Sequence, residues 1–407
     1  MSRVAVTGIG LVTPIGAGRD EVWEGLLEGR SGFAPVESFD TGRFTVHLGA
    51  EVKRFRPEPW VRHLDPSRLG RASQLAIAAA HMALEDAGLD AGTRHFESAR
   101  AHRAGVAMGT TSGEPREVER FDDRYLAGEM EGLGPEFIGL YPCHMIAAHV
   151  AREVGFGGPV TMIPTACAAG NYAIAHAFDL LRSGRADVML AGGADAFSRI
   201  TYAGFSRLGA IAPERCQPFD KNRKGMIPGE GAGVLVLEPV EKARARGARI
   251  YAEVAGYGLS CDAHHMTAAH PEADGAVRAM ERALADAGLH PDDVSYISAH
   301  GTGTPTNDRL ETLAAQRVFG ASTRTPMSSI KSMIGHTMGA ASAIEAAVCS
   351  LAVATGKIPP TMNLEEPDGD LDYVPNQARE HDVRVAMNNA YAFGGNNASV
   401  LFRRSEA

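Results

Sequence analysis

A single cysteine lies where a strand-like segment meets an Ala-rich helical segment. The stretch PTACAAGNYAIAHAFDLLRSG spans residues 164–184, and the three positions after Cys167 hold only Ala and Gly. A free cysteine is commonly a small buried hydrophobic residue. At a helix N-terminus it can instead be a nucleophile, because unpaired backbone N–H groups lower the pKa of the thiol and hold an oxyanion. The position leaves a structural and a catalytic role open.

Two histidines and a lysine occupy similar junctions in the second half of the chain. His300 ends a strand-like run in SAHGTGTPTND, where Gly-Thr pairs leave space beside the imidazole. Lys331 and His336 stand between another strand-like run and an Ala-rich segment. One histidine in a turn is more often structural than catalytic. Together with Cys167, however, these residues place reactive side chains at three predicted strand ends, as an active site requires.

Composition limits the class of protein. The chain has 407 residues, 44% hydrophobic and 22% charged, which is enough apolar material for a large core or two medium ones. A net charge of -9 without blocks of like charge gives no reason to expect nucleic acid or an anionic membrane as a partner. Five cysteines without a CxxC pair argue against a disulfide framework and a zinc site. We expect a globular protein without a bound metal.

Two apolar segments bear on the location of the protein. The start, MSRVAVTGIGLVTPIG, has polar and turn residues within a short apolar run, so we expect neither a signal peptide nor a membrane span there. The Ala-rich stretch 345–354 is bounded by Glu345 and Lys357, which favours a buried helix over a membrane helix. Both segments predict a cytoplasmic protein without membrane contact.

Strand-like and helical segments alternate along the chain. This alternation is the pattern of an α/β fold. Five predicted strands in the first part and five in the second suggest an internal duplication with a boundary near 238–250. The predicted strands are 3–10, 104–110, 160–166, 187–194, 233–239, 250–258, 294–302, 325–332, 383–393 and 399–404.

The segment after Cys167 has the periodicity of a buried helix. Ile174, Phe178 and Leu181 recur on one face, and Gly184 follows at the end, as is usual after a helix. Cys167 is therefore expected at or near the first turn. The backbone N–H groups there have no acceptor within the helix.

At this level of detail the sequence resembles the β-ketoacyl-acyl-carrier-protein synthases (ketosynthases) of the elongating branch of the thiolase superfamily. The matching stretches, in the family's order, are TACAAG, GEGAGVLVLE, DAHHMT, AHGTGTPTND, IKSMIGHTMGAASAIEA and AFGGNNAS. The family's cysteine, first histidine, lysine and second histidine correspond to Cys167, His300, Lys331 and His336. A catalytic set of Cys, His and Asn is typical of the related initiating synthases, and a set of Cys, His and Cys is typical of thiolases. A cysteine with two histidines therefore indicates the elongating branch.

The resemblance implies an architecture and partners. The fold would be the five-layered αβαβα thiolase arrangement, with residues 1–240 carrying the cysteine and 241–407 carrying both histidines. A dimer would form across the apolar edge strand 160–166, because such a strand needs a cover. It would be a homodimer or a heterodimer with a chain-length-factor-like subunit. Acyl carrier protein would deliver acyl and malonyl thioesters on its 4′-phosphopantetheine arm, so the enzyme would need no bound cofactor.

The resemblance also assigns the chemistry. Cys167 would take an acyl group as a thioester, and decarboxylation of a malonyl group would leave an enolate that attacks it. His300 and His336 would stabilise the thioester oxygen of the enolate through Nε2–H. The backbone N–H groups of Cys167 and Phe393 would form the oxyanion hole, and the Phe393 ring would act as a gate. Lys331 would fix the histidine region, because an ammonium group only donates hydrogen bonds.

Further residues receive roles from the resemblance, each beside a structural alternative. Thr302 and Thr304 would contact the pantetheine arm, or cap the helix that follows. Phe205 would line the acyl channel, or simply pack in the core. Glu345 and Asp308 would support the catalytic groups, or be an ordinary helix carboxylate and a helix cap, respectively. A basic set for docking an acidic carrier protein, with solvated surface charge as the alternative, comprises Arg68, Arg71, Lys221, Arg223 and Lys224.

One stretch departs from the fatty-acid enzymes of this family. They often close the acyl pocket with a bulky aliphatic residue where this chain has Thr111 and Ser112. A smaller and more polar wall admits a longer chain, or a polar, unsaturated one. Together with AYAFGGNNAS, this difference favours a type II polyketide or polyene synthase over fatty-acid elongation.

Two other classes of protein share some of these features. A Rossmann dehydrogenase is disfavoured, because Thr13 occupies the position of the third glycine in the GxGxxG pattern. A non-catalytic, chain-length-factor-like partner subunit would keep the fold and the docking surface. Such subunits lack the cysteine, so Cys167 favours a catalytic subunit.

Overall fold

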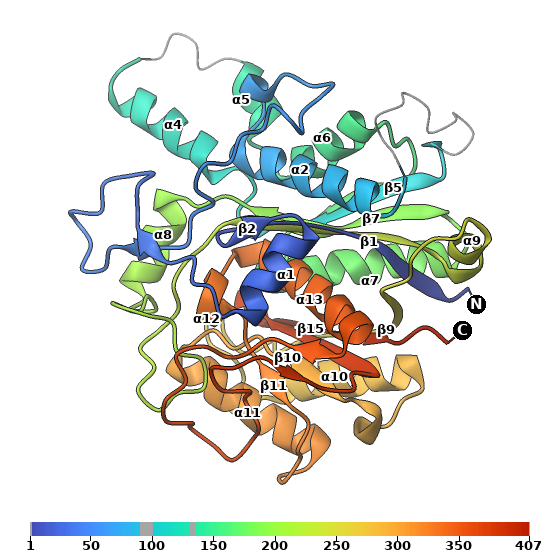
Figure 1. Ribbon diagram of the computed structural model, residues 1–407. Coiled ribbons are helices and arrows are strands. Elements are labelled where there is room, and N and C mark those ends of the chain that lie inside the picture. Colours follow the sequence, from blue (N-terminus) through green and yellow to red (C-terminus); the bar gives the residue numbers. More distant parts are fainter. Residues whose placement is uncertain (1, 90–100, 130–134, 407) are drawn as a thin grey trace.

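The computed structural model describes residues 2–89, 101–129 and 135–406. Its main elements form five layers, which Figure 1 shows from top to bottom as helix, sheet, helix, sheet and helix. The upper helices are α2 (Arg71–Asp86) and α6 (His144–Val154). The central helices are α7 (Ala169–Arg182) and α13 (Ala341–Thr355), and the lower ones are α10 (Asp274–Ala287) and α11 (Pro305–Phe319). The predicted αβαβα arrangement is confirmed.

The main strands follow one hydrogen-bonded path, in the order β11-β10-β14-β15-β9-β1-β8-β7-β5-β6. Each of the ten predicted strands overlaps one of them. Their bounds are β1 (Val4–Thr13), β5 (Ala104–Gly109), β6 (Val160–Ile163), β7 (Val188–Asp195), β8 (Gly231–Pro239), β9 (Ala252–Cys261), β10 (Tyr296–Ser298), β11 (Met327–Ser328), β14 (Val385–Tyr391) and β15 (Asn396–Arg403).

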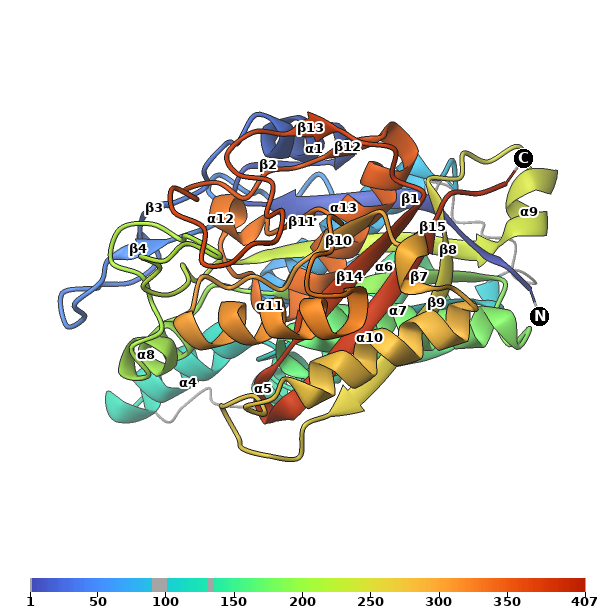
Figure 2. The ribbon, with the colours of Figure 1, turned by 90° about the horizontal axis from the view of Figure 1, so that it is seen from below.

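The path divides into two groups of five strands. The group of β6, β5, β7, β8 and β1 comes from the first part of the chain, and the other group comes from the second part. They are joined by a short antiparallel pairing of Val4–Val6 with residues 252–254. Figure 2, seen from below, shows α10 and α11 side by side across the second group. This symmetry agrees with an internal duplication, while the division at residue 240 stays a prediction.

The smaller elements connect these layers. The further α-helices are α1 (Arg19–Leu27), α4 (Pro115–Leu126), α5 (Pro135–Leu140), α8 (Arg199–Arg207), α9 (Val240–Ala245) and α12 (Lys331–Ile334). The 3₁₀ turns are η1 (Pro66–Arg68), η2 (Ala166–Ala168), η3 (Pro291–Asp293), η4 (Met338–Ala340) and η5 (Phe393–Gly395). The short strands are β2 (Gly16–Ala17), β3 (Ala34–Pro35), β4 (Leu48–Gly49), β12 (Lys357–Ile358) and β13 (Arg379–Glu380).

The central helices are enclosed between the two sheets, and small residues let them lie close together. A Cβ atom on Gly170 of α7 would lie 2.5 Å from the backbone nitrogen of Ala343 in α13, so only glycine fits there. The segment Met338–Thr355 is long and apolar enough to span a membrane, yet 89% of it is buried inside the protein. This confirms the prediction of a buried helix and explains its Ala-rich composition, since both of its faces meet protein.

Candidate active site

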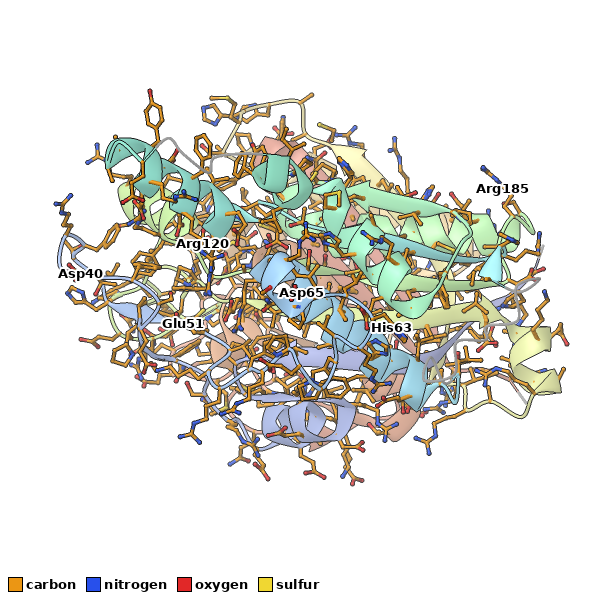
Figure 3. The ribbon with its side chains drawn as sticks, turned by 90° about the horizontal axis from the view of Figure 1, so that it is seen from above. Asp40, Glu51, His63, Asp65, Arg120 and Arg185 are labelled. Carbon is orange, nitrogen blue, oxygen red and sulfur yellow. The ribbon has the colours of Figure 1, made fainter. Side chains whose placement is uncertain are left out.

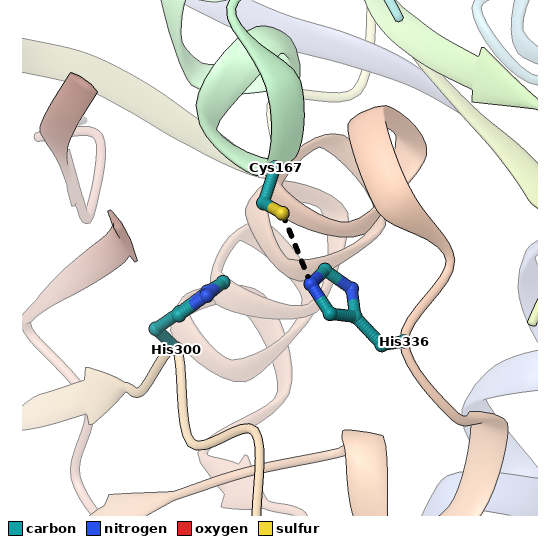
Figure 4. A group of neighbouring side chains, drawn as sticks. All are labelled: Cys167, His300 and His336. Carbon is teal, nitrogen blue, oxygen red and sulfur yellow. Dashed lines mark hydrogen bonds between the residues drawn. The ribbon is translucent and has the colours of Figure 1, made fainter. Parts of the chain in front are cut away.

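The structure brings Cys167 and the two histidines together at the centre of the molecule. Cys167 lies in η2, directly before α7, while His300 follows β10 and His336 precedes η4. Figure 4 shows the three side chains pointing toward one another. One reactive atom from each lies within 4.8 Å of the others, and all three residues are buried. His336 Nε2 lies 3.1 Å from Cys167 Sγ, and the two imidazole rings are 5.5 Å apart at 84°.

The turn that carries Cys167 is held by the neighbouring central helix. Ala166 adopts a left-handed conformation with φ of 51°, which is unfavourable for a residue with a Cβ atom. The Ser342 hydroxyl donates to the carbonyl of Cys167 at 3.1 Å, and the Asn171 N–H donates to that hydroxyl at 3.1 Å. Contacts between α7 and α13 therefore fix a backbone turn that local preferences disfavour.

The tautomer of His336 follows from its backbone contact. The Met338 N–H donates to His336 Nδ1 at 3.3 Å, so the proton of the neutral ring is on Nε2 and points at Cys167 Sγ. Burial, followed by the positive charge of Lys331, holds the pKa of His336 well below its ordinary value. The same two causes lower the pKa of His300, with a small contribution from His336. Both imidazoles are neutral hydrogen-bond donors at physiological pH.

A buried carboxylate that the sequence analysis missed holds His300. Glu311 of α11 accepts the backbone N–H groups of His300 and Gly301, both at 2.7 Å. Gly301 has φ of 37°, within the left-handed region that favours glycine. Asp308, which was predicted as a supporting residue, accepts the Gly303 N–H at 3.2 Å. The signal was available in NDRLETL, where Asp308 and Glu311 recur on one face of a predicted helix.

A buried ion pair lies beside the histidines. Lys331 is fully buried, and its ammonium group contacts Glu345 Oε1. Burial raises the pKa of Glu345 to about 7, although the charge of Lys331 opposes this shift. Lys331 and Glu345 therefore lie together, close to the reactive groups. The other oxygen, Glu345 Oε2, is buried without a hydrogen-bond partner among the described residues.

The electrostatics of the thiol differ from the expectation at a helix N-terminus. The sequence predicted that unpaired N–H groups would lower the pKa of Cys167. Burial instead raises the pKa of the thiol to about 12, with the Lys331 charge as the largest opposing influence. The reason is that Cys167 is 7% exposed, so a thiolate there loses most of its hydration. The resting side chain is a thiol, and a thiolate needs the Nε2–H of His336 to stabilise it.

The three side chains open into a cavity of about 210 Å³. Thr302 and Thr304, predicted to contact the pantetheine arm, line this cavity, and their hydroxyl oxygens lie 2.8 Å apart. Phe205 and Phe393 also line it, with ring centroids 5.7 Å apart. Phe393 is 40% exposed and is followed by Gly394 with φ of 79°. Phe205, predicted to line the acyl channel, and Phe393, predicted to act as a gate, therefore contact each other in the wall of the cavity that contains Cys167.

Thr111 and Ser112 are not among the described residues that line this cavity. Their backbone N–H groups donate to the buried Asp195, at 2.7 and 3.1 Å. Asp195 also accepts the Gly339 N–H at 2.6 Å, so it ties this loop to the turn after His336. Sequence reasoning missed Asp195, which ends the strand AGGAD without a distinguishing pattern. A role of Thr111 and Ser112 in the acyl wall stays a prediction.

The predicted docking cations fall into two groups. Arg68 is exposed in η1, where Asp65, marked in Figure 3, accepts the Ser67 N–H at 2.9 Å. Lys221 and Lys224 are exposed as well. Two members are instead bound to carboxylates of the chain itself: Arg71 contacts Glu230 at 2.9 Å, and Arg223, 8% exposed, contacts Asp368 at 2.7 Å. These two guanidinium groups are engaged in internal contacts rather than presented to solvent.

Comparison with known proteins agrees with this geometry. Residues 1–243 match the family described as "Beta-ketoacyl synthase, N-terminal domain", and residues 251–365 match "Beta-ketoacyl synthase, C-terminal domain". The chain is 40% identical to 3-oxoacyl-(acyl-carrier-protein) synthase 2 of Synechocystis sp. over 99% of this chain and 98% of that protein. It is 42% identical to nodulation protein E of Rhizobium sp. over 99% of both chains.

Solved structures give the same result. The ishigamide ketosynthase/chain length factor structure has a TM-score of 0.95 and 44% identity over the whole of both chains. A type II PKS ketosynthase in complex with its acyl-carrier protein has a TM-score of 0.90 and 33% identity over 99% of this chain and 100% of that one.

The chain belongs to the β-ketoacyl synthase family, with the thiolase-like fold. It is an acyltransferase that catalyses the condensation by which ketoacyl carrier protein is formed in fatty-acid or type II polyketide biosynthesis. Its Cys167, His300 and His336 form the active-site triad. The family uses substrates bound to acyl carrier protein and has no cofactor of its own.

The raised pKa of Cys167 predicts an unusual pH dependence of alkylation. Because the thiol has a pKa of about 12, only a small fraction is thiolate near neutral pH, and this fraction increases as the pH is raised toward 12. Iodoacetamide should modify Cys167 about tenfold faster for each unit between pH 7 and pH 9. Peptide mapping by mass spectrometry separates this reaction from that of the exposed Cys261. A rate that levels off below pH 9 would show that the helix N-terminus outweighs burial.

Proposed function

We propose that Cys167 carries the growing acyl chain as a thioester, that His336 assists its acylation, and that His300 and His336 act together in the second half of the reaction. The observation that carries this division of roles is the placement of a neutral donor, His336 Nε2–H, 3.1 Å from Cys167 Sγ. A donor at that distance stabilises the thiolate while the acyl group is transferred from the carrier thioester. The proton of the thiol leaves with the departing pantetheine thiolate, so the free arm is released as a thiol.

The malonyl group enters second. When its carboxylate leaves as carbon dioxide, negative charge develops on the thioester oxygen, and the Nε2–H groups of His300 and His336 are positioned to stabilise it. Neutral imidazoles suit this role because each ring already carries an N–H group, so no proton is gained or lost before it donates. The lowered pKa of each ring, caused by burial and by Lys331, supports it. Lys331 and Glu345 act as positioning residues in this scheme.

The resulting carbon attacks the Cys167 thioester and forms a tetrahedral oxyanion. We assign its donors to the backbone N–H groups of Cys167 and Phe393, and the loss of one such donor typically costs about 3 kcal/mol in the barrier. The gate role of the Phe393 ring is supported by its partial exposure and by the following glycines, Gly394 and Gly395, which both have positive φ. Collapse of the oxyanion returns the Cys167 thiolate and releases the extended ketoacyl thioester.

Within the family, we propose a type II polyketide or polyene pathway for this chain. The small polar residues Thr111 and Ser112 are the sequence feature behind this choice, although, in the described part of the chain, they do not line the cavity that holds Cys167. The ketosynthase/chain length factor neighbour is 44% identical, compared with 40% for a 3-oxoacyl-(acyl-carrier-protein) synthase 2. The contacts of Cys167 argue for a catalytic subunit rather than a chain-length-factor-like one.

We further propose that the protein is a cytoplasmic dimer built across β6. This strand ends the sheet path and exposes 43% of Val160, and among the described residues it pairs with β5 alone. An apolar strand at a sheet edge is a ready template for pairing. Because solved neighbours include ketosynthase/chain length factor assemblies, the partner is either a second copy of the chain or a chain-length-factor-like subunit.

Light scattering tests the dimer. At micromolar concentration the measured mass should be that of two copies of the chain. Alternatively, a monomer should increase in mass by one subunit when a chain-length-factor-like partner is added. The same measurement on Val160→Lys, which puts a charge on the edge strand, should show a weaker association. A monomer under both conditions contradicts the proposal.

The Cys167→Gln variant separates the two half-reactions. Condensation should be abolished because no thioester can form, whereas decarboxylation of malonyl carrier protein should continue because both histidine donors remain. Intact-mass analysis of the carrier protein reports both reactions. Condensation that survives in this variant would exclude Cys167 as the acyl carrier.

The histidine variants give the complementary result. His300→Ala and His336→Ala should each lose malonyl decarboxylation by at least about a hundredfold, while Cys167 still accepts some acyl group. Decarboxylation at the wild-type rate in either variant would mean that the histidine in question only shapes the fold.

Docking of the acidic carrier protein is assigned to the exposed cations Arg68, Lys221 and Lys224. Charges at the rim of an interface mainly change the association rate and its salt dependence. Arg68→Glu should therefore raise the KM for acyl carrier protein several-fold, with little change for an acyl-pantetheine that lacks the protein. Arg185→Glu is the matched control, since Figure 3 shows the exposed Arg185 at one end of the molecule and Asp65 near the middle of the view. An equal loss of activity with acyl carrier protein and with the acyl-pantetheine would indicate that Arg68 supports the fold instead.

A further inference from the structure

Asn307 lies at the wall of the active-site cavity with its amide orientation fixed. It belongs to the first turn of α11 and is partly buried. Its Nδ2 donates to Asp308 Oδ1 at 3.1 Å and to Glu311 Oε2 at 3.5 Å. A flipped amide would place Oδ1 against Asp308 Oδ1 and Glu311 Oε2, two oxygens that already accept the backbone N–H groups of Gly303 and Gly301. The amino group therefore faces the interior, away from the cavity.

This orientation leaves an acceptor directed at the cavity. Within the part of the chain that the structure describes, Asn307 Oδ1 accepts no hydrogen bond, and it is not among the buried unpartnered atoms, so it stays accessible. Asn307 lines the same cavity as Thr302, Thr304 and Cys167. An amide oxygen whose own N–H groups donate to carboxylates is polarised, which makes it a better acceptor.

The cavity wall thus has the two complementary groups that a secondary amide needs. Thr302 and Thr304 share one hydrogen bond, which uses one of their two hydroxyl hydrogens and leaves the other free to donate to a carbonyl oxygen. Asn307 Oδ1 can only accept, so it suits an N–H group. A pantetheine arm contains two secondary amides, each with one N–H and one carbonyl.

We propose that Asn307 Oδ1 accepts the N–H of one amide of the substrate's pantetheine arm, and that Asn307 is a binding residue for the thioester substrate. This inference rests on the proposed delivery of acyl groups to Cys167 on such an arm. Binding of the arm at Asn307 would be linked to His300, because Glu311 accepts hydrogen bonds from both the Asn307 amide and the backbone of His300. Arm binding and the position of His300 depend on the same carboxylate.

The test removes the N–H from the substrate and the oxygen from the enzyme in turn. The substrates are hexanoyl-pantetheine and two analogues in which an ester oxygen replaces one or the other amide N–H. The initial rate of acylation of Cys167, followed by intact mass, should fall about tenfold for one of the two analogues in the wild-type protein. In Asn307→Ala the same analogue should react at nearly the rate of hexanoyl-pantetheine, because the acceptor is gone.

The comparison uses the ratio of two rates in one protein, so a lower folded fraction cancels. Arg309→Ala changes an exposed residue of the same helix and should keep the wild-type ratio. Asn307→Ser, which keeps a donor for the carboxylates but withdraws the amide oxygen, serves if the alanine variant does not fold. An unchanged discrimination in the Asn307 variants, or none in the wild type, overturns the inference. Absence of any acylation at Cys167 in the wild type overturns the proposed function as well.

Discussion

The close contact between α7 and α13 is the constraint on which the rest of the structure depends. Each helix covers a sheet on its outer side, so the two can meet only through small residues, and Gly170 approaches Ala343 where no Cβ atom would fit. The contact brings Ser342 to the carbonyl of Cys167 and so supports the left-handed turn at Ala166. A catalytic cysteine in an unfavourable turn is stable here because the packing of the whole central layer holds it.

Burial produces a site whose groups are neutral at rest. Cys167 stays protonated, and His300 and His336 stay uncharged, because none of them retains enough hydration to carry a charge easily. Lys331 supplies a buried positive charge in this region, and Glu345 forms an ion pair with it. Negative charge that develops during the reaction therefore meets fixed donors and one buried cation, with little reorganisation of solvent.

The sequence was sufficient for the fold and for the reactive residues, for identifiable reasons. The ten strands of the main sheet path were predicted because β-branched runs alternate with Ala-rich segments. Cys167, His300 and His336 were found from their places at predicted strand ends together with the resemblance to the family. The supporting carboxylates were harder to find. Asp195 and Glu311 act by accepting N–H groups of loops far away in the chain, and no local pattern records which loop a carboxylate meets. The same reason hid the partners of Arg71 and Arg223, which appeared as surface cations but pair with Glu230 and Asp368.

The two groups of five strands have different chemical duties. Under the proposed mechanism, the first half contributes the cysteine that carries the acyl group, and the second contributes the two histidines that act on the malonyl unit, although their folds are alike. The two halves are also joined at the site itself, because Asp195 accepts the Gly339 N–H and the carbonyl of Ile227 accepts the His336 N–H. A substitution that moves these first-half loops therefore also moves a histidine of the second half.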